Sequence, residues 1–373
     1  MKHRTTQITL IAAHFLFALL VTSMQPLLPV FQEEFGLGLF QSSILPIAVT
    51  VSVMIANLFV GFLIGHLGQK TVLVGSAILE TAAILLIFLS PGFIGVFIGF
   101  SCIGLASGSA FTALITIYSE LPDAYQDFGL FHAFFGVGGM ASPIIANLWL
   151  SSGRGIGGLF GIYGLAFFLL LACLILSRQI HNLRFREFAM KDMVKSLSSP
   201  IIILGVLILS FYAAVEIGGT TWHVNAGMSI FGLDKSSAGF LLSGFWLTFT
   251  LSRIVTDAIA RRTGELQLAL MCSAAAAVIL VLWLAGSSPY LFPFLGFALG
   301  PILPVVQKHV NGRLPRHQRG LFNGVTYLGT GIGATVFIPF MGALGEFNLA
   351  LAYIPLVVNL VIMIGLLHML RTR

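Results

Sequence analysis

Two acidic residues, Glu80 and Glu216, stand inside long apolar stretches of this 373-residue chain. An ionised side chain at the centre of a bilayer costs at least ~2.5–3.5 kcal/mol, so such residues are rare and mark functional sites by default. A carboxyl in that setting can bind a proton from one side of a membrane and release it to the other. Gly218 and Gly219 follow Glu216, and they weaken a helix and expose its backbone. We therefore expect a discontinuous helix here, with Glu216 as the proton-coupling residue.

Two further residues are candidates for a second proton site or for a purely structural role. Glu80 lies within a run of alanine, isoleucine and leucine residues, where a hydrogen bond to a neighbouring helix is the simpler expectation. His223 follows Glu216 by seven residues, which is two helical turns, so the two share one face of a helix. An isolated histidine inside a membrane helix is more often a neutral hydrogen-bonding residue than a proton relay.

A sugar site would need aromatic rings for the apolar faces of the sugar and amide groups for its hydroxyls. Six residues of these types are candidates for substrate binding: Gln25, Trp222, Asn225, Gln307, Asn323 and Tyr327. Asn323 and Tyr327 are four residues apart and share one helix face. The chain also has 33 phenylalanines, which could instead line an apolar pocket for lipophilic compounds.

The composition identifies the elements that must position these residues. Hydrophobic residues make up 57% of the chain and charged residues only 9%, against about 25% charged in soluble domains. A soluble enzyme, a disordered chain and a coiled coil are therefore excluded. The apolar runs are continuous and do not alternate, so they predict helices and not a barrel. The twelve predicted spans are residues 7–30, 42–66, 71–89, 92–119, 128–150, 155–177, 201–226, 237–260, 267–285, 289–311, 321–345 and 349–370.

The basic residues predict how the chain is oriented. If the N-terminus is inside, 17 of the 19 Lys and Arg residues fall in inner segments, and only Arg154 and Lys235 lie outside. This asymmetry satisfies the positive-inside rule and predicts a multi-pass protein of the cell (inner) membrane with both termini cytoplasmic. It also accounts for the net charge of +6 without a nucleic-acid partner. The first span runs into Pro26 and Pro29 with no small-residue cleavage pattern, so we expect no cleaved signal peptide.

The twelve spans fall into two halves around one polar, basic linker. We predict a first six-helix bundle over 1–177, a cytoplasmic linker over 178–200 and a second six-helix bundle over 201–373. The linker carries Arg178, Arg184, Arg186, Lys191 and Lys195. Short motifs recur in the two halves at an offset of roughly 190–197 residues, for example the sequence FGL at 35–37 and again at 231–233. Parallel repeats of this kind are one known transporter architecture.

These features resemble the major facilitator superfamily. Its loop after span two has the pattern G-x-L-x-D-x-x-G-x-K, and residues 61–70 read GFLIGHLGQK, with Gly65 in place of the acid. The second copy runs from Arg253 through Asp257 to a basic pair and a glycine. The resemblance implies an all-α fold of two six-helix pseudo-repeats and alternating access. It also implies gate or conformational roles for Gly68, Lys70, Arg253 and Asp257, although pairing of Arg253 with Asp257 one turn away is the simplest structural expectation.

Three segments are similar to the fucose/galactose/glucose–proton symporter branch of that superfamily. They are residues 134–143, 211–216 together with Trp222, and 300–304. The resemblance implies proton-coupled uptake, a symport, of a small neutral solute such as a sugar. Proton-coupled efflux of lipophilic compounds is the alternative, and a non-transporting membrane sensor is a remote one.

The remaining expectations concern chemistry and partners. No nucleophile–base spacing is present, so an enzyme is not expected, and no phosphate-binding G-x-x-x-x-G-K-[ST] motif occurs. No cofactor and no metal are expected. The expected partners are a small-molecule substrate, protons and the lipid bilayer, with the protein functional as a monomer.

Overall fold

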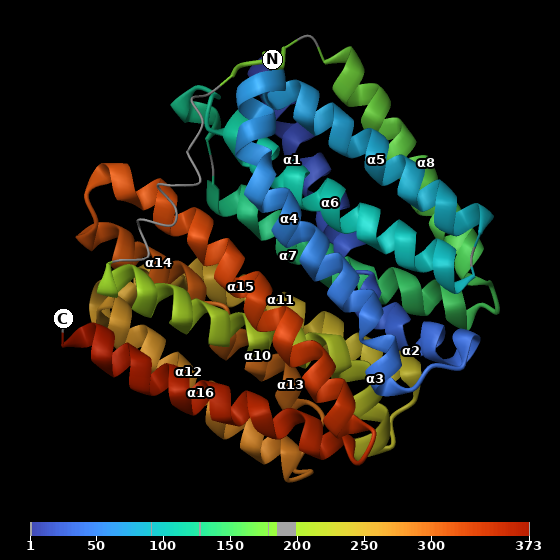
Figure 1. The fold of residues 1–373 in the computed structure, drawn as a ribbon, viewed down its shortest axis with the longest axis vertical. Coiled ribbons are helices and arrows are strands. Elements are labelled where there is room, and N and C mark those ends of the chain that lie inside the picture. Colours follow the sequence, from blue (N-terminus) through green and yellow to red (C-terminus); the bar gives the residue numbers. More distant parts are fainter. Residues whose placement is uncertain (1, 91, 127, 178, 185–198, 373) are drawn as a thin grey trace. The chain divides into compact units, whose positions relative to one another are not determined.

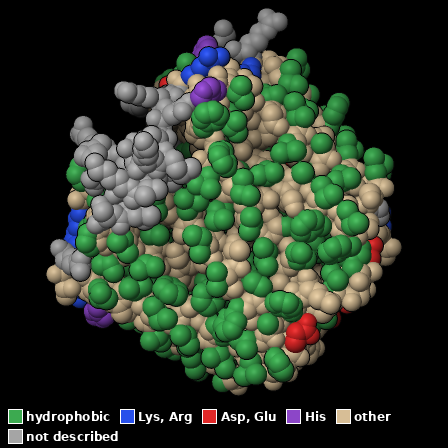
Figure 2. All heavy atoms as spheres, in the orientation of Figure 1, with side chains coloured by type: hydrophobic (Ala, Val, Ile, Leu, Met, Phe, Trp, Pro, Cys, Tyr) green, Lys and Arg blue, Asp and Glu red, His purple; other side chains and the backbone are tan. Residues whose placement is uncertain are grey.

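The computed structural model describes residues 2–90, 92–126, 128–177, 179–184 and 199–372. Linker residues Arg178, Arg186, Lys191 and Lys195 lie outside the described residues. Within the described part, twelve helical segments are long and apolar enough to cross a membrane, which confirms the prediction of an all-α membrane protein with twelve spans. Figure 2 shows hydrophobic side chains over much of the visible face. Large apolar residues such as Leu165, Phe168 and Val361 are at least 60% exposed, as expected of surfaces that face lipid.

The described chain forms the following helices (Figure 1): α1 Lys2–Val21, α2 Met24–Phe35, α3 Leu39–Ser42, α4 Ile44–Leu67, α5 Gln69–Leu89, α6 Phe93–Tyr118, the 3-10 turn η1 Asp123–Tyr125, α7 Phe128–Ser151, α8 Ile156–Leu176, α10 Pro200–Phe231, α11 Lys235–Thr263, α12 Glu265–Leu284, α13 Leu291–Leu299, α14 Ile302–Arg313, α15 Arg316–Gly345 and α16 Leu349–Arg371. Several are longer than predicted. In particular, α10 begins one residue before the predicted seventh span and ends five residues after it.

The chain divides into two compact units, Met1–Met24 with Ala48–Glu187 and Gln25–Ile47 with Phe188–Arg373. In the first unit, α5 packs against α6 and α8, and α1 packs against α7 and α6. In the second unit, α10 packs against α15 and α16, α11 against α13, and α12 against α16. The segment 25–47, which the sequence-based division assigns to the first bundle, is grouped here with the second unit. That division into bundles and linker stays a prediction.

Polar contacts join the segment 25–47 to the rest of the second unit. The amide of Asn225 donates to Gln32 Oε1 at 2.5 Å. Lys235 forms an ion pair with Glu33 at 2.7 Å. The backbone N–H of Phe40 donates to Glu346 Oε1 at 3.0 Å. The partners come from α10, from the start of α11 and from the residue after α15, so α2 and α3 are anchored to three helices of this unit.

Spans one and ten are each broken near a proline. Span one is interrupted at Thr22 and Ser23, between α1 and α2. Pro26 has no N–H to donate to the Thr22 carbonyl four residues before it. Span ten is interrupted at Gly300 and Pro301, between α13 and α14. These breaks divide helices that the sequence predicted to be continuous.

The break expected at Gly218 and Gly219 is absent, because α10 is continuous across both residues. That expectation was wrong. A glycine inside a helix costs only about 1 kcal/mol and keeps its N–H, whereas proline costs about 3 kcal/mol and has none. The small glycines are used for packing instead, since a Cβ on Gly218 would approach the Met341 sulfur to 2.9 Å.

Glycines also allow close contact between pairs of helices. A Cβ on Gly138 of α7 would lie 2.8 Å from the backbone nitrogen of Leu19 in α1. A Cβ on Gly333 of α15 would overlap the backbone carbonyl of Ser210 in α10. The paired helices α10 and α15 run beside each other in Figure 1.

We expect Gly333→Ala to destabilise the protein by about 1–3 kcal/mol, the range for overpacking a tight contact. The added methyl group would overlap backbone, which cannot rotate away as a side chain can. The matched control is Gly365→Ala in α16, where nothing lies within 4 Å of the new Cβ. Thermal melting of the purified proteins in detergent measures the difference. Equal melting temperatures for the two variants would contradict the packing argument.

Candidate functional site

Glu216 lies halfway along α10, sixteen residues after Pro200 and fifteen before Phe231. Its side chain is partly exposed, unlike most of its neighbours on this helix. Arg253 and Tyr212 are its electrostatic neighbours. The helix therefore extends about equally far on either side of the acid.

Arg253 is held by features of the neighbouring span. Its Nε donates to the carbonyl of Gly300 at 3.3 Å. In an unbroken helix that carbonyl would accept from the N–H of residue 304, but Pro304 has none. The guanidinium also lies 4.2 Å from the centre of the Phe249 ring, in a cation–π contact. A break in span ten thus supplies the acceptor that an arginine inside an apolar helix needs.

The absence of a side chain at Gly300 brings these two spans together. A Cβ there would lie 2.6 Å from the Phe249 carbonyl oxygen and would overlap the Ser252 hydroxyl, both in α11. Only glycine lets the backbone of span ten approach α11 so closely. Arg253 can then reach the free carbonyl.

A third helix contributes Tyr327, which is 51% exposed on α15 and interacts electrostatically with Arg253. Electrostatic interactions link Tyr212, Glu216, Arg253 and Tyr327 across α10, α11 and α15, and these four residues are here called the Arg253 cluster. Tyr212 is fully buried in it. The cluster combines an acid halfway along α10, a permanent cation and a half-exposed phenol, a set that can bind a proton and a polar ligand.

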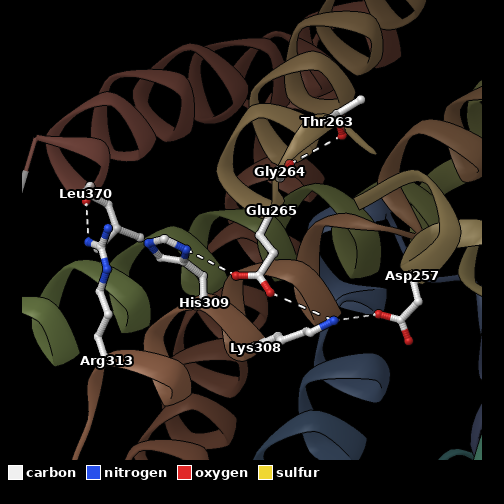
Figure 3. Close-up of polar contacts among 8 residues, drawn as sticks. All are labelled: Asp257, Thr263, Gly264, Glu265, Lys308, His309, Arg313 and Leu370. Atoms are coloured by element: carbon white, nitrogen blue, oxygen red, sulfur yellow. Dashed lines mark hydrogen bonds and ion pairs between the residues drawn. The ribbon is translucent and has the colours of Figure 1, made fainter. Parts of the chain in front are cut away.

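Asp257 does not pair with Arg253, so that expectation was wrong. Its carboxylate accepts from Lys308 Nζ at 3.0 Å, and Lys308 also lies 3.9 Å from Glu265. His309 Nδ1 is 3.2 Å from the other Glu265 oxygen (Figure 3). Lys308 and Asp257 are both more than half exposed, and exposed ion pairs contribute only about 0–1 kcal/mol.

Several substrate-binding candidates are engaged in the interior of the second unit. Trp222 is fully buried and donates from Nε1 to the Ile338 carbonyl at 3.1 Å, so it offers no ring surface to a ligand in this structure. Gln25 donates to Thr220 at 2.9 Å and accepts from Trp246 at 3.2 Å.

Of the remaining substrate-binding candidates, two are hydrogen-bonded within the second unit and two are partly exposed. The amide of Asn225 is bonded to Gln32, and Asn323 accepts from Asn311 at 2.9 Å. Gln307 is partly exposed on α14. Tyr327 is the candidate that joins the Arg253 cluster.

Glu80 and His223 are both fully buried, in surroundings that indicate a structural role. Glu80 is fully buried on α5 and accepts from the Ser107 hydroxyl of α6 at 3.2 Å, which is the interhelical hydrogen bond expected from the sequence. His223 is fully buried and stacks on Phe292 with ring centroids 3.6 Å apart. It therefore points into the core of the second unit.

Gly68 and Lys70 hold the chain that follows α8. Gly68 has φ +89°, a conformation that favours glycine, between α4 and α5. Lys70 Nζ donates to the Ser177 carbonyl at 2.6 Å. Asn182 caps the start of α5, accepting from the backbone N–H groups of Lys70 at 3.0 Å and Thr71 at 3.1 Å. It also donates to the Leu67 carbonyl at 2.9 Å.

Sequence reasoning missed Tyr212, the Gly300 acceptor and Asn182. The spacing of Gly300 and Pro304 was a usable signal, because a proline four residues after any helical residue leaves that carbonyl without a donor. No comparable signal marks Asn182, whose partners lie 111 and 112 residues away in the sequence.

Twelve apolar helices, with an acid halfway along one of them and an arginine within another, define a polytopic membrane protein of the secondary-transporter class. Comparison with known proteins agrees. A model of the Major Facilitator Superfamily matches residues 10–294 and 228–373, and the chain belongs to that superfamily. Its members are carriers and not enzymes, so the expectation of no enzyme is confirmed.

Individual relatives are more distant. The chain is 33% identical over 136 residues to the inner membrane transport protein YnfM of Escherichia coli (strain K12), a match that covers 36% of this chain and 32% of that protein. The nucleoside transporter NupG is 12% identical with a TM-score of 0.77, and the alignment covers 98% of both chains. A peptide transporter, POT, is 14% identical with a TM-score of 0.77, over 98% of this chain and 93% of that one. These two likenesses show the fold alone.

We expect Asn182→Ala to destabilise the protein by about 0.5–2 kcal/mol, the usual loss for a helix N-cap. Asn182→Asp is the matched variant, because it keeps the acceptor oxygen and places a negative charge at a helix N-terminus, which is favourable. Its melting temperature in detergent should fall between those of the wild type and Asn182→Ala. An alanine variant as stable as the wild type would show that the cap contributes nothing.

Proposed function

We propose that this chain is a proton-coupled secondary transporter in which Glu216 binds and releases the coupling proton. The observation that carries the proposal is the Arg253 cluster, where a partly exposed acid lies at mid-depth beside a permanent cation. A buried group without access to water could not exchange protons during a transport cycle. Glu216 has both the depth and the exposure that proton exchange requires.

Glu80 is the natural comparison, because it is the other acid inside a span. It is fully buried and hydrogen-bonded to Ser107. Its environment supports a structural role between α5 and α6. A carboxyl sealed in this way would need the helices to separate before a proton could enter.

The transported solute is small and polar in this proposal, and the direction is uptake. The sugar prediction relied on Trp222 and on amide groups, and Trp222 is buried while Gln25, Asn225 and Asn323 are bonded within the second unit. These contacts favour other polar solutes over a sugar. The resemblance to the sugar symporters stays a prediction. A charged, phenol-bearing cluster also supports a polar solute over the lipophilic cargo of an efflux carrier.

The remaining parts of the proposal follow from charge and chain geometry. The distribution of basic residues supports an inner-membrane protein with both termini cytoplasmic. The break at Thr22 and Ser23 lies just before the point where the chain passes from the first unit to the second. We propose that this break serves as a hinge during alternating access, and that the protein acts as a monomer.

The test uses proteoliposomes loaded with a pH-sensitive dye and screened with sugars, nucleosides, amino acids and carboxylates. For any solute that moves protons, Glu216→Gln should abolish accumulation driven by a pH gradient. The variant should keep counterflow, which exchanges labelled for unlabelled solute without net proton movement. Glutamine preserves size and hydrogen bonding but cannot carry the proton.

Glu80→Gln is the matched control, since it makes the same change in the other membrane-embedded acid. It should retain both gradient-driven accumulation and counterflow, because glutamine can still accept from Ser107. The assignment fails if Glu216→Gln accumulates solute normally. It also fails if Glu80→Gln, and not Glu216→Gln, uncouples transport from the pH gradient.

A further inference from the structure

The Arg253 cluster contains a cation that the fold does not neutralise by direct pairing. Among the described residues, none of the ion pairs involves Arg253, and the nearby carboxylates Asp257 and Glu265 are engaged by Lys308 and His309. Nε of Arg253 is bound by the Gly300 carbonyl. That bond uses Nε. The two terminal nitrogens of a guanidinium form a fork that can bind a carboxylate with two parallel hydrogen bonds.

We propose that the solute carried by this transporter is a small organic carboxylate that binds to Arg253. This inference rests on the proposed function, because it assigns the substrate class of the same site. Tyr327 is half exposed on α15 and interacts electrostatically with Arg253, and it supplies a ring and a hydroxyl for the remainder of the solute. The carboxylate replaces the neutral solute expected from the sequence.

Charge balance explains why such a solute would be coupled to a proton. With Glu216 ionised and Arg253 protonated, the empty cluster carries no net charge. Binding of a proton to a Glu216 oxygen leaves a charge of +1, and binding of a carboxylate at Arg253 returns the cluster to zero. The empty cluster and the fully loaded cluster are therefore neutral, whereas each half-loaded cluster is charged. An uncompensated charge within the membrane is costly, so the half-loaded forms are disfavoured during reorientation.

The other groups packed around α10 do not disturb this balance. Tyr353 of α16 donates its hydroxyl to the Gly219 carbonyl at 2.8 Å. Gln25 of α2, which approaches through Thr220, carries no charge. On α11 and α14, Asp257, Lys308 and His309 form the separate network with Glu265 shown in Figure 3. The titratable and charged groups that interact with Glu216 are Arg253 and Tyr212, and Tyr327 interacts with Arg253.

The net charge moved in each transport cycle distinguishes a carboxylate from a neutral solute. One proton moving with a neutral molecule transfers one positive charge in each cycle, so membrane potential alone would drive accumulation. One proton moving with one carboxylate transfers none. A pH gradient should then drive accumulation, and a potential imposed without a pH gradient should not.

The first experiment measures binding to the purified full-length protein by thermal melting in detergent. The probes are acetate, lactate and benzoate, each compared with its uncharged amide, that is acetamide, lactamide and benzamide. A ligand that binds the folded state raises its stability. We expect at least one acid to raise the melting temperature more than its amide does. The effect should grow as the pH is lowered, because a protonated Glu216 favours carboxylate binding in the proposed charge balance.

Arg253→Lys should weaken the binding of that acid by about tenfold, because the ammonium keeps the charge but loses one of the two parallel hydrogen bonds. Arg262→Lys, an exposed arginine at the end of the same helix, is the matched control and should bind like the wild type. In proteoliposomes, the acid that binds should accumulate with a pH gradient and not with a potassium diffusion potential.

The proposal is overturned if none of the three acids stabilises the protein, if the amides stabilise it equally, or if Arg253→Lys binds as the wild type does. Accumulation driven by potential alone would also overturn it. These failures are distinct from failure of the proton assignment. If Glu216 is not the coupling group, Glu216→Gln will retain gradient-driven accumulation while the acids still bind at Arg253.

Discussion

The cost of placing a charged side chain among apolar helices shapes this structure more than any other constraint. An arginine cannot lose its proton in a protein, so Arg253 must be stabilised where it lies. The structure does this with a backbone carbonyl left free by Pro304, with the Phe249 ring, and with Glu216 and Tyr212 from the adjacent helix. Gly300 is needed for the same reason, because any larger residue would move that carbonyl away from α11. A proline and a glycine in span ten therefore help to stabilise the charge of Arg253 in span eight.

The same constraint distinguishes the two membrane-embedded acids. Glu80 is sealed between α5 and α6 and receives a hydroxyl hydrogen bond, so its environment is that of a neutral polar residue holding two helices together. Glu216 faces a cation and retains partial exposure. Residue type alone could not separate them, since both are glutamates within apolar runs. What separates them is the neighbouring helix, which supplies a hydroxyl in one case and a guanidinium in the other.

The sequence was sufficient for those features that depend on composition along one helix. All twelve spans and the Glu80 hydrogen bond between helices follow from hydropathy and the cost of burying polar groups. The sequence was insufficient to predict a side chain's partner where that partner lies on another helix. Asp257 is one turn away from Arg253 on the same helix, yet its carboxylate pairs with Lys308 of α14, which is 51 residues further along the chain. Trp222 has the chemistry of a sugar platform, and only the position of α15 shows that it is buried.

The segment 25–47 contacts both α10 and α11, the helices that carry Glu216 and Arg253. Gln25 of α2 binds Thr220, and the Thr220 hydroxyl also donates to the backbone carbonyl of Glu216 at 2.8 Å. Gln25 accepts in addition from Trp246, two turns before Arg253 on α11. One uncharged residue thus contacts both helices that supply the charged pair. Because α2 follows directly after the break at Thr22 and Ser23, a change in the direction of the chain at that break would pull on α10 and α11 together. Movement at the proposed hinge would therefore act on the spacing between Glu216 and Arg253, the distance on which proton binding in the proposed mechanism depends.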